Sequence, residues 1–206
     1  MGASLKIVAI ALILAAAVSP AKADHYRAQV SPEPEGNLDN YFALDVGRTL
    51  ATDLCSGMPL GVTGCKDTAG LIRAAIGGQF TPMWGMEVSY GNLGKASAGK
   101  LGSVSVDWQI YALQVSGTVT YPLSSTFSLI GKLGIARPDL KLTGGGNSVS
   151  ETNTNLAFGI GAQYDFTKSV AIRVQYENLG TVGNADTTGT SKVGLLSAGI
   201  VLGFGY

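Results

Sequence analysis

The sequence predicts an all-β fold, an eight-stranded antiparallel transmembrane β-barrel with its N- and C-termini in the periplasm. Three observations carry this prediction: a secretory signal at the N-terminus, eight segments in which apolar and polar residues alternate, and connections that are alternately short and long. The composition agrees, because the chain is 46% hydrophobic, only 14% charged and contains 29 glycines. No stretch after the signal reaches the 18 apolar residues of a transmembrane helix.

Residues 1–23 have the three parts of a signal peptide. Residues 1–6 carry one positive charge, residues 7–18 are all apolar, and residues 21–23 (AKA) form a small-residue cleavage site. The apolar run of 12 residues is too short to cross a bilayer, so we expect cleavage between Ala23 and Asp24 rather than a retained anchor. Loss of Lys6 and Lys22 changes 14 basic and 14 acidic residues to 12 and 14, a net charge of −2, which does not favour nucleic-acid binding.

Two segments outside the alternating pattern have simple interpretations. Residues 24–39 hold two prolines and no apolar period, so they predict a periplasmic N-terminal linker before the barrel of residues 40–206. Cys55 and Cys65 lie ten positions apart in a Gly-, Pro- and Thr-containing stretch, and in an exported protein this spacing predicts one disulfide within a loop. A two-thiol metal site is the alternative, but no histidine or third cysteine lies nearby, so we expect neither metal nor cofactor.

In each alternating segment one face is apolar or aromatic and the other is Gly, Ala, Ser, Thr, Gln or charged. The lengths, seven to eleven residues, suit tilted strands that cross a bilayer. In chain order the segments are 41–49 (YFALDVGRT), 72–80 (IRAAIGGQF), 84–90 (WGMEVSY), 111–121 (YALQVSGTVTY), 127–136 (FSLIGKLGIA), 156–166 (LAFGIGAQYDF), 170–177 (VAIRVQYE) and 196–206 (LSAGIVLGFGY).

The connections distinguish this barrel from a soluble β-sandwich, whose strands also alternate. Segments two and three, four and five, and six and seven are joined by a few residues, as short periplasmic turns are. The other connections are several times longer and rich in Gly, Ser, Thr and Asn, for example residues 94–103 (GKASAGKLGS) and 143–155 (TGGGNSVSETNTN). We expect these to be mobile external loops.

Aromatic residues gather at the ends of the segments, as in the two interfacial girdles of a membrane barrel. We place Tyr90, Trp108 and Tyr176 near the external ends. The ends that carry the short turns hold Tyr41, Phe80, Trp84, Tyr121, Phe127, Phe166 and Tyr206.

Six charged residues share the parity of the face that points away from lipid, where a charge near the membrane midplane would be costly. Three are acidic and three basic, so they can neutralise one another in a narrow lumen, although parity does not say which acid pairs with which base. The alternative is the solvated face of a soluble sandwich, which the signal and the girdles disfavour. The predicted lumen network is Asp45, Arg73, Glu87, Lys132, Arg173 and Glu177.

The third and seventh segments end alike, as MEVSYGNLG (86–94) and IRVQYENLG (172–180). With YFALDVGRT and the terminal LSAGIVLGFGY, these segments resemble the OmpA-like and OmpX-like eight-stranded outer membrane protein β-barrel family, which includes opacity-type proteins. The resemblance covers residues 40–206 and implies localisation in a Gram-negative outer membrane. It also implies insertion by the barrel assembly machinery, which reads a C-terminal aromatic strand, here Phe204 and Tyr206.

Enzyme activity is not expected. Relatives that modify lipid A need a histidine base, and the single histidine, His25, lies in the predicted linker. We therefore predict a structural protein of the cell envelope, in contact with outer-membrane lipid and lipopolysaccharide, whose external loops meet host or other surface ligands. The alternative is a small pore or conduit for ions or small hydrophobic molecules, favoured by the Gly- and Ala-rich inner face.

Overall fold

The computed structural model describes residues 40–52, 64–101, 104–184 and 189–204. The predicted signal peptide (1–23) with its cleavage site Ala23–Asp24, the linker (24–39), Cys55 and Tyr206 lie outside the described residues, and the predictions about them stay predictions. Within the described ranges there is no helix long and apolar enough to cross a membrane.

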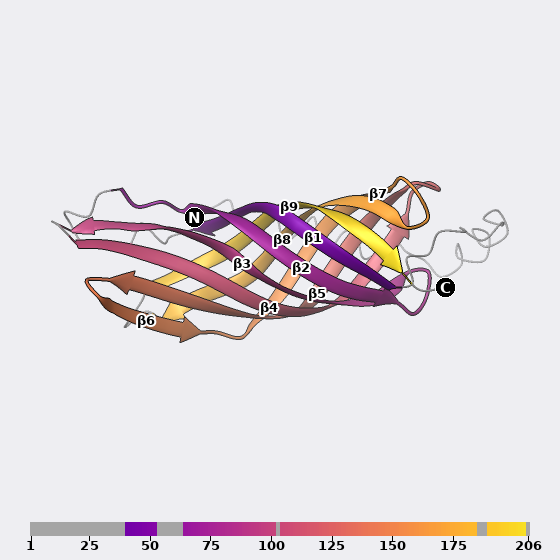
Figure 1. Ribbon diagram of the computed structural model, residues 1–206. Helices are drawn as coiled ribbons and strands as arrows, with labels where there is room; N and C mark the ends of the chain where they lie inside the picture. The colour runs from indigo at the N-terminus through magenta and orange to yellow at the C-terminus, as the bar shows by residue number, and fades with distance from the viewer. Residues whose placement is uncertain (1–39, 53–63, 102–103, 185–188, 205–206) are drawn as a thin grey trace, which may run out of the picture. The chain divides into compact units, whose positions relative to one another are not determined.

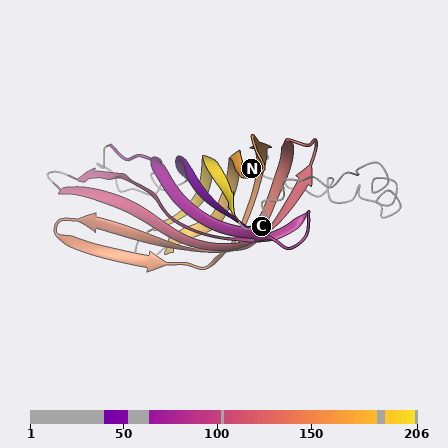
Figure 2. The same ribbon diagram turned by 45° about the vertical axis from the view of Figure 1, so that its right-hand side comes forward.

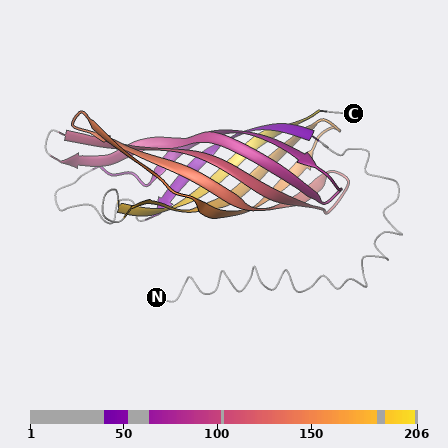
Figure 3. The ribbon, with the colours of Figure 1, turned by 90° about the horizontal axis from the view of Figure 1, so that it is seen from below.

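The described chain forms one antiparallel sheet of nine strands in the order β4-β3-β2-β1-β9-β8-β7-β5-β6. Pairing of β4 with β5 closes the sheet, so eight strands form the predicted barrel and β6 is added to the outer half of β5. Figures 1 and 3 show the tilted strands winding around a common axis. The strands are β1 Asn40–Thr52, β2 Thr68–Gln79, β3 Trp84–Leu101, β4 Val104–Pro122, β5 Phe127–Gly144, β6 Asn147–Thr152, β7 Asn155–Asp165, β8 Val170–Asn184 and β9 Gly189–Phe204.

The three short turns at one end, residues 80–83, 123–126 and 166–169, share one construction. In each, a hydroxyl oxygen accepts a hydrogen bond from the backbone N–H three residues later: Thr81 from Trp84, Ser124 from Phe127 and Thr167 from Val170, at 2.9–3.0 Å. A serine or threonine that caps a turn in this way replaces part of the missing backbone ladder. We call this the turn end of the barrel and the opposite end the loop end.

Several strands are longer than predicted. β3, β4 and β5 have 18, 19 and 18 residues, and at the loop end they reach further than β1 and β9 (Figures 1 and 2). Residues 94–101, expected in a mobile loop, pair with β4 as far as Leu101 opposite Val104, and residues 147–152 form β6 rather than loop. The outer pairing of β3 with β4 runs to the hairpin end through two register shifts, after Asn92 and after Ser97, and Lys95 forms an ion pair with Asp107 (3.2 Å).

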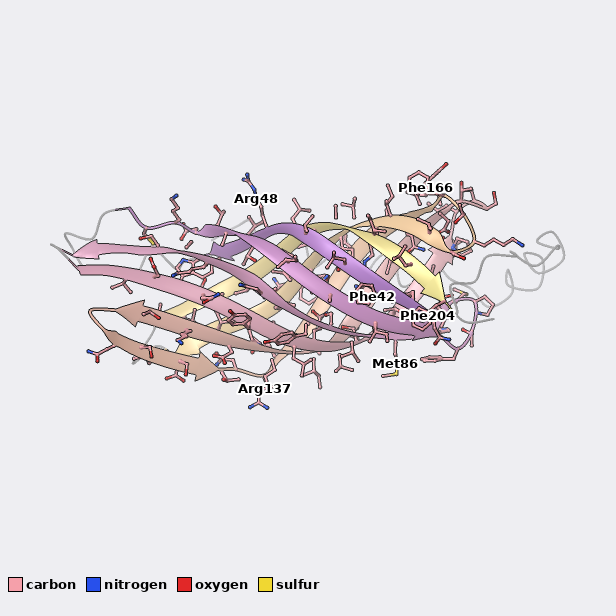
Figure 4. All side chains as sticks on the ribbon, in the orientation of Figure 1. Phe42, Arg48, Met86, Arg137, Phe166 and Phe204 are labelled. Atoms are coloured by element: carbon pink, nitrogen blue, oxygen red, sulfur yellow. The ribbon has the colours of Figure 1, made fainter. Side chains whose placement is uncertain are left out.

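The two faces of the barrel differ as predicted. The outward residues are apolar and exposed, for example Val46 (55%), Ile76 (56%) and Ile160 (71%), and the Met86 side chain points away from the barrel in Figure 4. Two aromatic predictions are wrong, because Tyr41 (8%) and Trp108 (0%) are buried inside. The other described girdle residues, Phe80, Trp84, Tyr90, Tyr121, Phe127, Phe166 and Tyr176, are exposed or lie on the outward face.

Candidate functional site

The interior contains a charge layer formed by the six residues of the predicted lumen network. β1 supplies Asp45, β2 Arg73, β3 Glu87, β5 Lys132, and β8 both Arg173 and Glu177. Each side chain is almost fully buried and takes part in at least one ion pair with another member of the set. With three acids and three bases, the layer is electrically neutral, the condition under which buried charges are tolerated.

Arg173 occupies the centre of the charge layer. Its Nε and Nη2 donate to the two carboxylate oxygens of Asp45 at 2.9 and 2.7 Å, and its Nη1 donates to Glu87. Gly199 of β9 lies between these two strands, in register with both Asp45 and Arg173. A Cβ at Gly199 would lie 2.1 Å from Asp45 Oδ1, so glycine leaves the space in which this pair meets.

The remaining ion pairs connect further strands. Lys132 Nζ donates to Glu87 at 2.7 Å and lies 3.9 Å from Glu177. Arg73 bridges Glu177 and Asp45 through the same nitrogen, Nη2. Because the pairs run across the lumen as well as between neighbours, they link strands that share no backbone hydrogen bonds.

Three polar residues complete the charge layer and were not part of the predicted network. The Tyr41 hydroxyl donates to Glu87 (2.8 Å), Gln114 Nε2 donates to Glu177 (2.9 Å), and Gln175 Nε2 lies 3.5 Å from Asp45. All three have the inward parity of their strands, so the alternation itself was the signal that could have identified them.

Toward the loop end the lumen is filled by an apolar layer, where the sequence suggested small and polar residues. Its largest member is Trp108, whose Nε1 donates to the Lys66 carbonyl oxygen at 3.1 Å. Fourteen buried residues form this layer: Ala51, Ala69, Leu71, Leu93, Trp108, Ile110, Ala112, Ala136, Leu140, Ala157, Leu179, Val182, Val193 and Leu195. In the lumen, the charge layer thus lies toward the turn end and the apolar layer toward the loop end.

The repeated Tyr-x-Asn-Leu-Gly motif forms the same β-bulge twice. Register shifts follow Asn92 in β3 and Asn178 in β8. Gly94 and Gly180 have φ values of 113° and 79°, and their N–H groups donate to the side-chain oxygens of Asn92 and Asn178 at 2.9 and 2.8 Å. Glycine is favoured at these positions because L-residues rarely adopt positive φ.

Each bulge aims its leucine into the apolar layer, where Leu93 and Leu179 are 0% and 1% exposed. Neighbouring side chains satisfy the leucine carbonyl oxygens: the Thr49 hydroxyl donates to that of Leu93, and Asn155 Nδ2 to that of Leu179 at 2.9 Å. The repeat, whose meaning was open from sequence, thus encodes a local structure.

The described side chains of the two layers take part in ion pairs, hydrogen bonds and apolar packing. No group of three or more His, Cys, Asp or Glu side chains that could hold a metal occurs in the described ranges. Cys65 lies just before β2, and its predicted partner Cys55 is outside the described residues, so the disulfide stays a prediction.

A closed antiparallel barrel with an apolar outer face and an ion-paired interior defines the class of outer-membrane β-barrels. The chain belongs to the family described as outer membrane protein beta-barrel domain, which matches residues 8–205. It is 30% identical over 138 residues to outer membrane protein A of Shigella flexneri, a match that covers 64% of this chain and 39% of that protein. The same protein of Klebsiella pneumoniae is 30% identical over 140 residues, 64% of this chain and 40% of the relative. The chain thus spans well under half the length of these relatives.

Solved structures share the fold. The chain is similar to Neisserial surface protein A (TM-score 0.60, 18% identity, 81% of this chain and 97% of that one). It is also similar to Ail of Yersinia pestis (TM-score 0.51, 21% identity, 81% and 99%) and to the N-terminal barrel of Pseudomonas aeruginosa OprF (TM-score 0.54, 12% identity, 82% and 99%). The predicted family and outer-membrane localisation are therefore confirmed.

Proposed function

We propose that this protein is a non-enzymatic, non-conducting barrel that contributes to envelope integrity and presents its loop end to the outside of the cell. The observation that supports the closed state is the filling of the lumen by two layers of different chemistry. An ion would have to break buried pairs in the charge layer and then lose its hydration among the side chains of the apolar layer.

The surface role is the second part of the proposal. The loop ends of β3 to β6 carry polar, exposed residues such as Ser148 and Ser150 beyond the apolar outer face, as suits contact with external molecules. Ail of Yersinia pestis has been solved in complex with the heparin analogue sucrose octasulfate, and we propose surface ligands for the loop end of this protein as well. The short turns support a periplasmic position for the turn end, because outer-membrane barrels carry short turns on the periplasmic side.

Planar-bilayer conductance of the refolded protein tests the closed state. We expect no steady single-channel steps from the wild type, and none from Arg173→Met, because the apolar layer stays in place. Trp108→Ala combined with Leu195→Ala thins that layer and serves as the variant in which leak is first expected. Steady steps from the wild type that change with the charge of Arg173 would contradict the proposal and favour a small conduit.

One observation favours the conduit alternative. Several buried polar atoms in the lumen have no protein partner, namely Arg73 Nε and Nη1, Gln114 Oε1, Gln175 Oε1 and Ser197 Oγ. Buried polar groups of this kind bind ordered water. Local hydration of the charge layer does not by itself open the apolar layer, and for this reason we place the conduit second.

A further inference from the structure

Two equivalent rows of outward side chains run across the barrel surface, about midway along their strands. In the first row Tyr176 of β8 is in register with Leu196 of β9, which is in register with Arg48 of β1. The second row has the same composition in the same order: Tyr90 of β3, Leu113 of β4 and Arg137 of β5. We call these the first and second Tyr-Leu-Arg rows.

The two rows lie on opposite sides of the barrel. Each strand of the second row is four barrel strands away from its counterpart in the first, in a barrel of eight. Figure 4 shows Arg48 and Arg137 pointing outward on opposite sides, at a similar level between the two ends. Both tyrosines begin the Tyr-x-Asn-Leu-Gly motif, so the repeat seen in the sequence extends to the outer surface.

All six side chains lie on the lipid-facing side. Tyr176 is 44% exposed, Leu196 50%, Tyr90 58% and Leu113 45%, and both arginines are exposed. Neither arginine takes part in an ion pair within the described ranges. An unpaired arginine on the apolar face is costly near the membrane midplane, but the cost falls to about 0–1 kcal/mol near the interface.

The level of the rows fits an interface. From Phe127 at the turn end to Arg137 is ten residues, which at a tilt of about 40° corresponds to roughly 25 Å along the barrel axis. From Phe204 to Leu196, beside Arg48, the same arithmetic gives roughly 20 Å. These values are close to the height of the apolar band, about 25 Å. Tyrosine also favours the headgroup level.

We infer that each Tyr-Leu-Arg row binds one lipopolysaccharide molecule, with a lipid A phosphate on the arginine and an acyl chain against the leucine. This inference rests on the proposed orientation, in which the loop end faces the outer leaflet. A guanidinium donates two parallel hydrogen bonds to a phosphate, and the tyrosine hydroxyl adds a polar contact at the same level. The Tyr176 ring leans across β9, since a Cβ at Gly194 would lie 3.2 Å from its hydroxyl oxygen.

A second level of basic residues, closer to the loop end than the two arginines, favours lipopolysaccharide over a phospholipid as the ligand. Lys192 lies four residues beyond Leu196 on β9, and Lys141 four residues beyond Arg137 on β5, both outward and exposed. Four residues correspond to about 13 Å along a strand, more than a single phosphate headgroup extends. Asp139 lies between Arg137 and Lys141 on the same face, so the second row carries one opposing charge. A lipid with several anionic groups in a headgroup that extends away from the membrane can contact both the arginines and the lysines.

Native mass spectrometry of the detergent-solubilised protein with added lipid A tests this inference. We expect two bound lipid A molecules for the wild type, with affinity about fivefold lower at the altered row in Arg48→Gln and in Arg137→Gln, and at both rows in the double variant. Lys168→Gln at the turn end is the charge-matched control and should bind like the wild type. Gel mobility before and after heating shows that each variant is folded.

Other results would overturn the inference. Unchanged binding by the double variant would exclude the arginines, and equal binding of dephosphorylated lipid A would exclude the phosphate contact. Equal binding of phosphatidylglycerol would replace lipopolysaccharide by anionic lipid in general. Because binding in detergent does not depend on orientation, protease cleavage of the loop end on intact cells tests the proposed orientation separately.

Discussion

Replacing Arg173 by methionine tests the charge layer most directly. The guanidinium makes three charge-assisted hydrogen bonds, two to Asp45 and one to Glu87. At about 1.5–3 kcal/mol each, their loss sums to roughly 4.5–9 kcal/mol. Part of this is recovered, because Asp45 keeps Arg73 and Glu87 keeps Lys132. We therefore expect the free energy of unfolding to fall by about 3–5 kcal/mol, the range for breaking a buried ion pair.

Urea unfolding in neutral lipid vesicles, followed by tryptophan fluorescence and gel mobility, measures this change. Lys132→Met should lower the free energy of unfolding by less, about 1.5–3 kcal/mol, because Glu87 still pairs with Arg173 and Glu177 still pairs with Arg73. Arg137→Met, an arginine on the outer face, is the matched control and should change stability by at most about 1 kcal/mol. A wild-type urea midpoint for Arg173→Met would refute the stabilising role of the charge layer.

Three further predictions concern single sites. Gly199→Ala should destabilise the barrel by about 1–3 kcal/mol in the same urea assay, since its Cβ would displace Asp45, and an unchanged midpoint would show that the pair can move. Asn178→Ala should lower the free energy of unfolding by about 0.5–1.5 kcal/mol, because it removes the acceptor for the Gly180 N–H. Hydrogen exchange of that N–H should then be faster than in the wild type. Deletion of Tyr206 should leave precursor processing intact and block outer-membrane insertion, measured by cell fractionation; normal assembly would contradict the targeting role.

The alternation of apolar and polar residues was the main basis for predicting the strands and the inward-facing charges. It placed Asp45 and Arg173 on the inner face, because a two-residue period assigns every second side chain to one side. It could not pair them, since Gly199 separates their strands and the contact depends on barrel closure. The positions of Tyr41 and Trp108 show that parity is a better guide than residue type. Both have inward parity and are buried, whereas their aromatic character predicts a place in the girdles.

The apolar layer and the strand lengths were harder to predict for a different reason. Each bulge adds one residue to its strand, so the inward parity changes after Gly94 and Gly180 and the next inward residue is Ala96 or Val182. A fixed period therefore fails beyond these points. The Asn-x-Gly pattern inside the repeated motif was the available signal, since asparagine binds backbone two residues on and glycine accepts positive φ.

The ion pairs of the charge layer also bear on how the barrel assembles. Asp45 belongs to β1 and Arg173 to β8, 128 residues apart, with β9 between them in the sheet. Their contact is therefore among those of highest sequence separation, and the entropy of closing that long segment must be lost before the contact forms. The Asp45 carboxylate and the Arg173 guanidinium are held at contact distance only when β9 pairs with both β1 and β8. Burial of the Asp45–Arg173 pair is therefore cooperative with the pairing of β9 between β1 and β8.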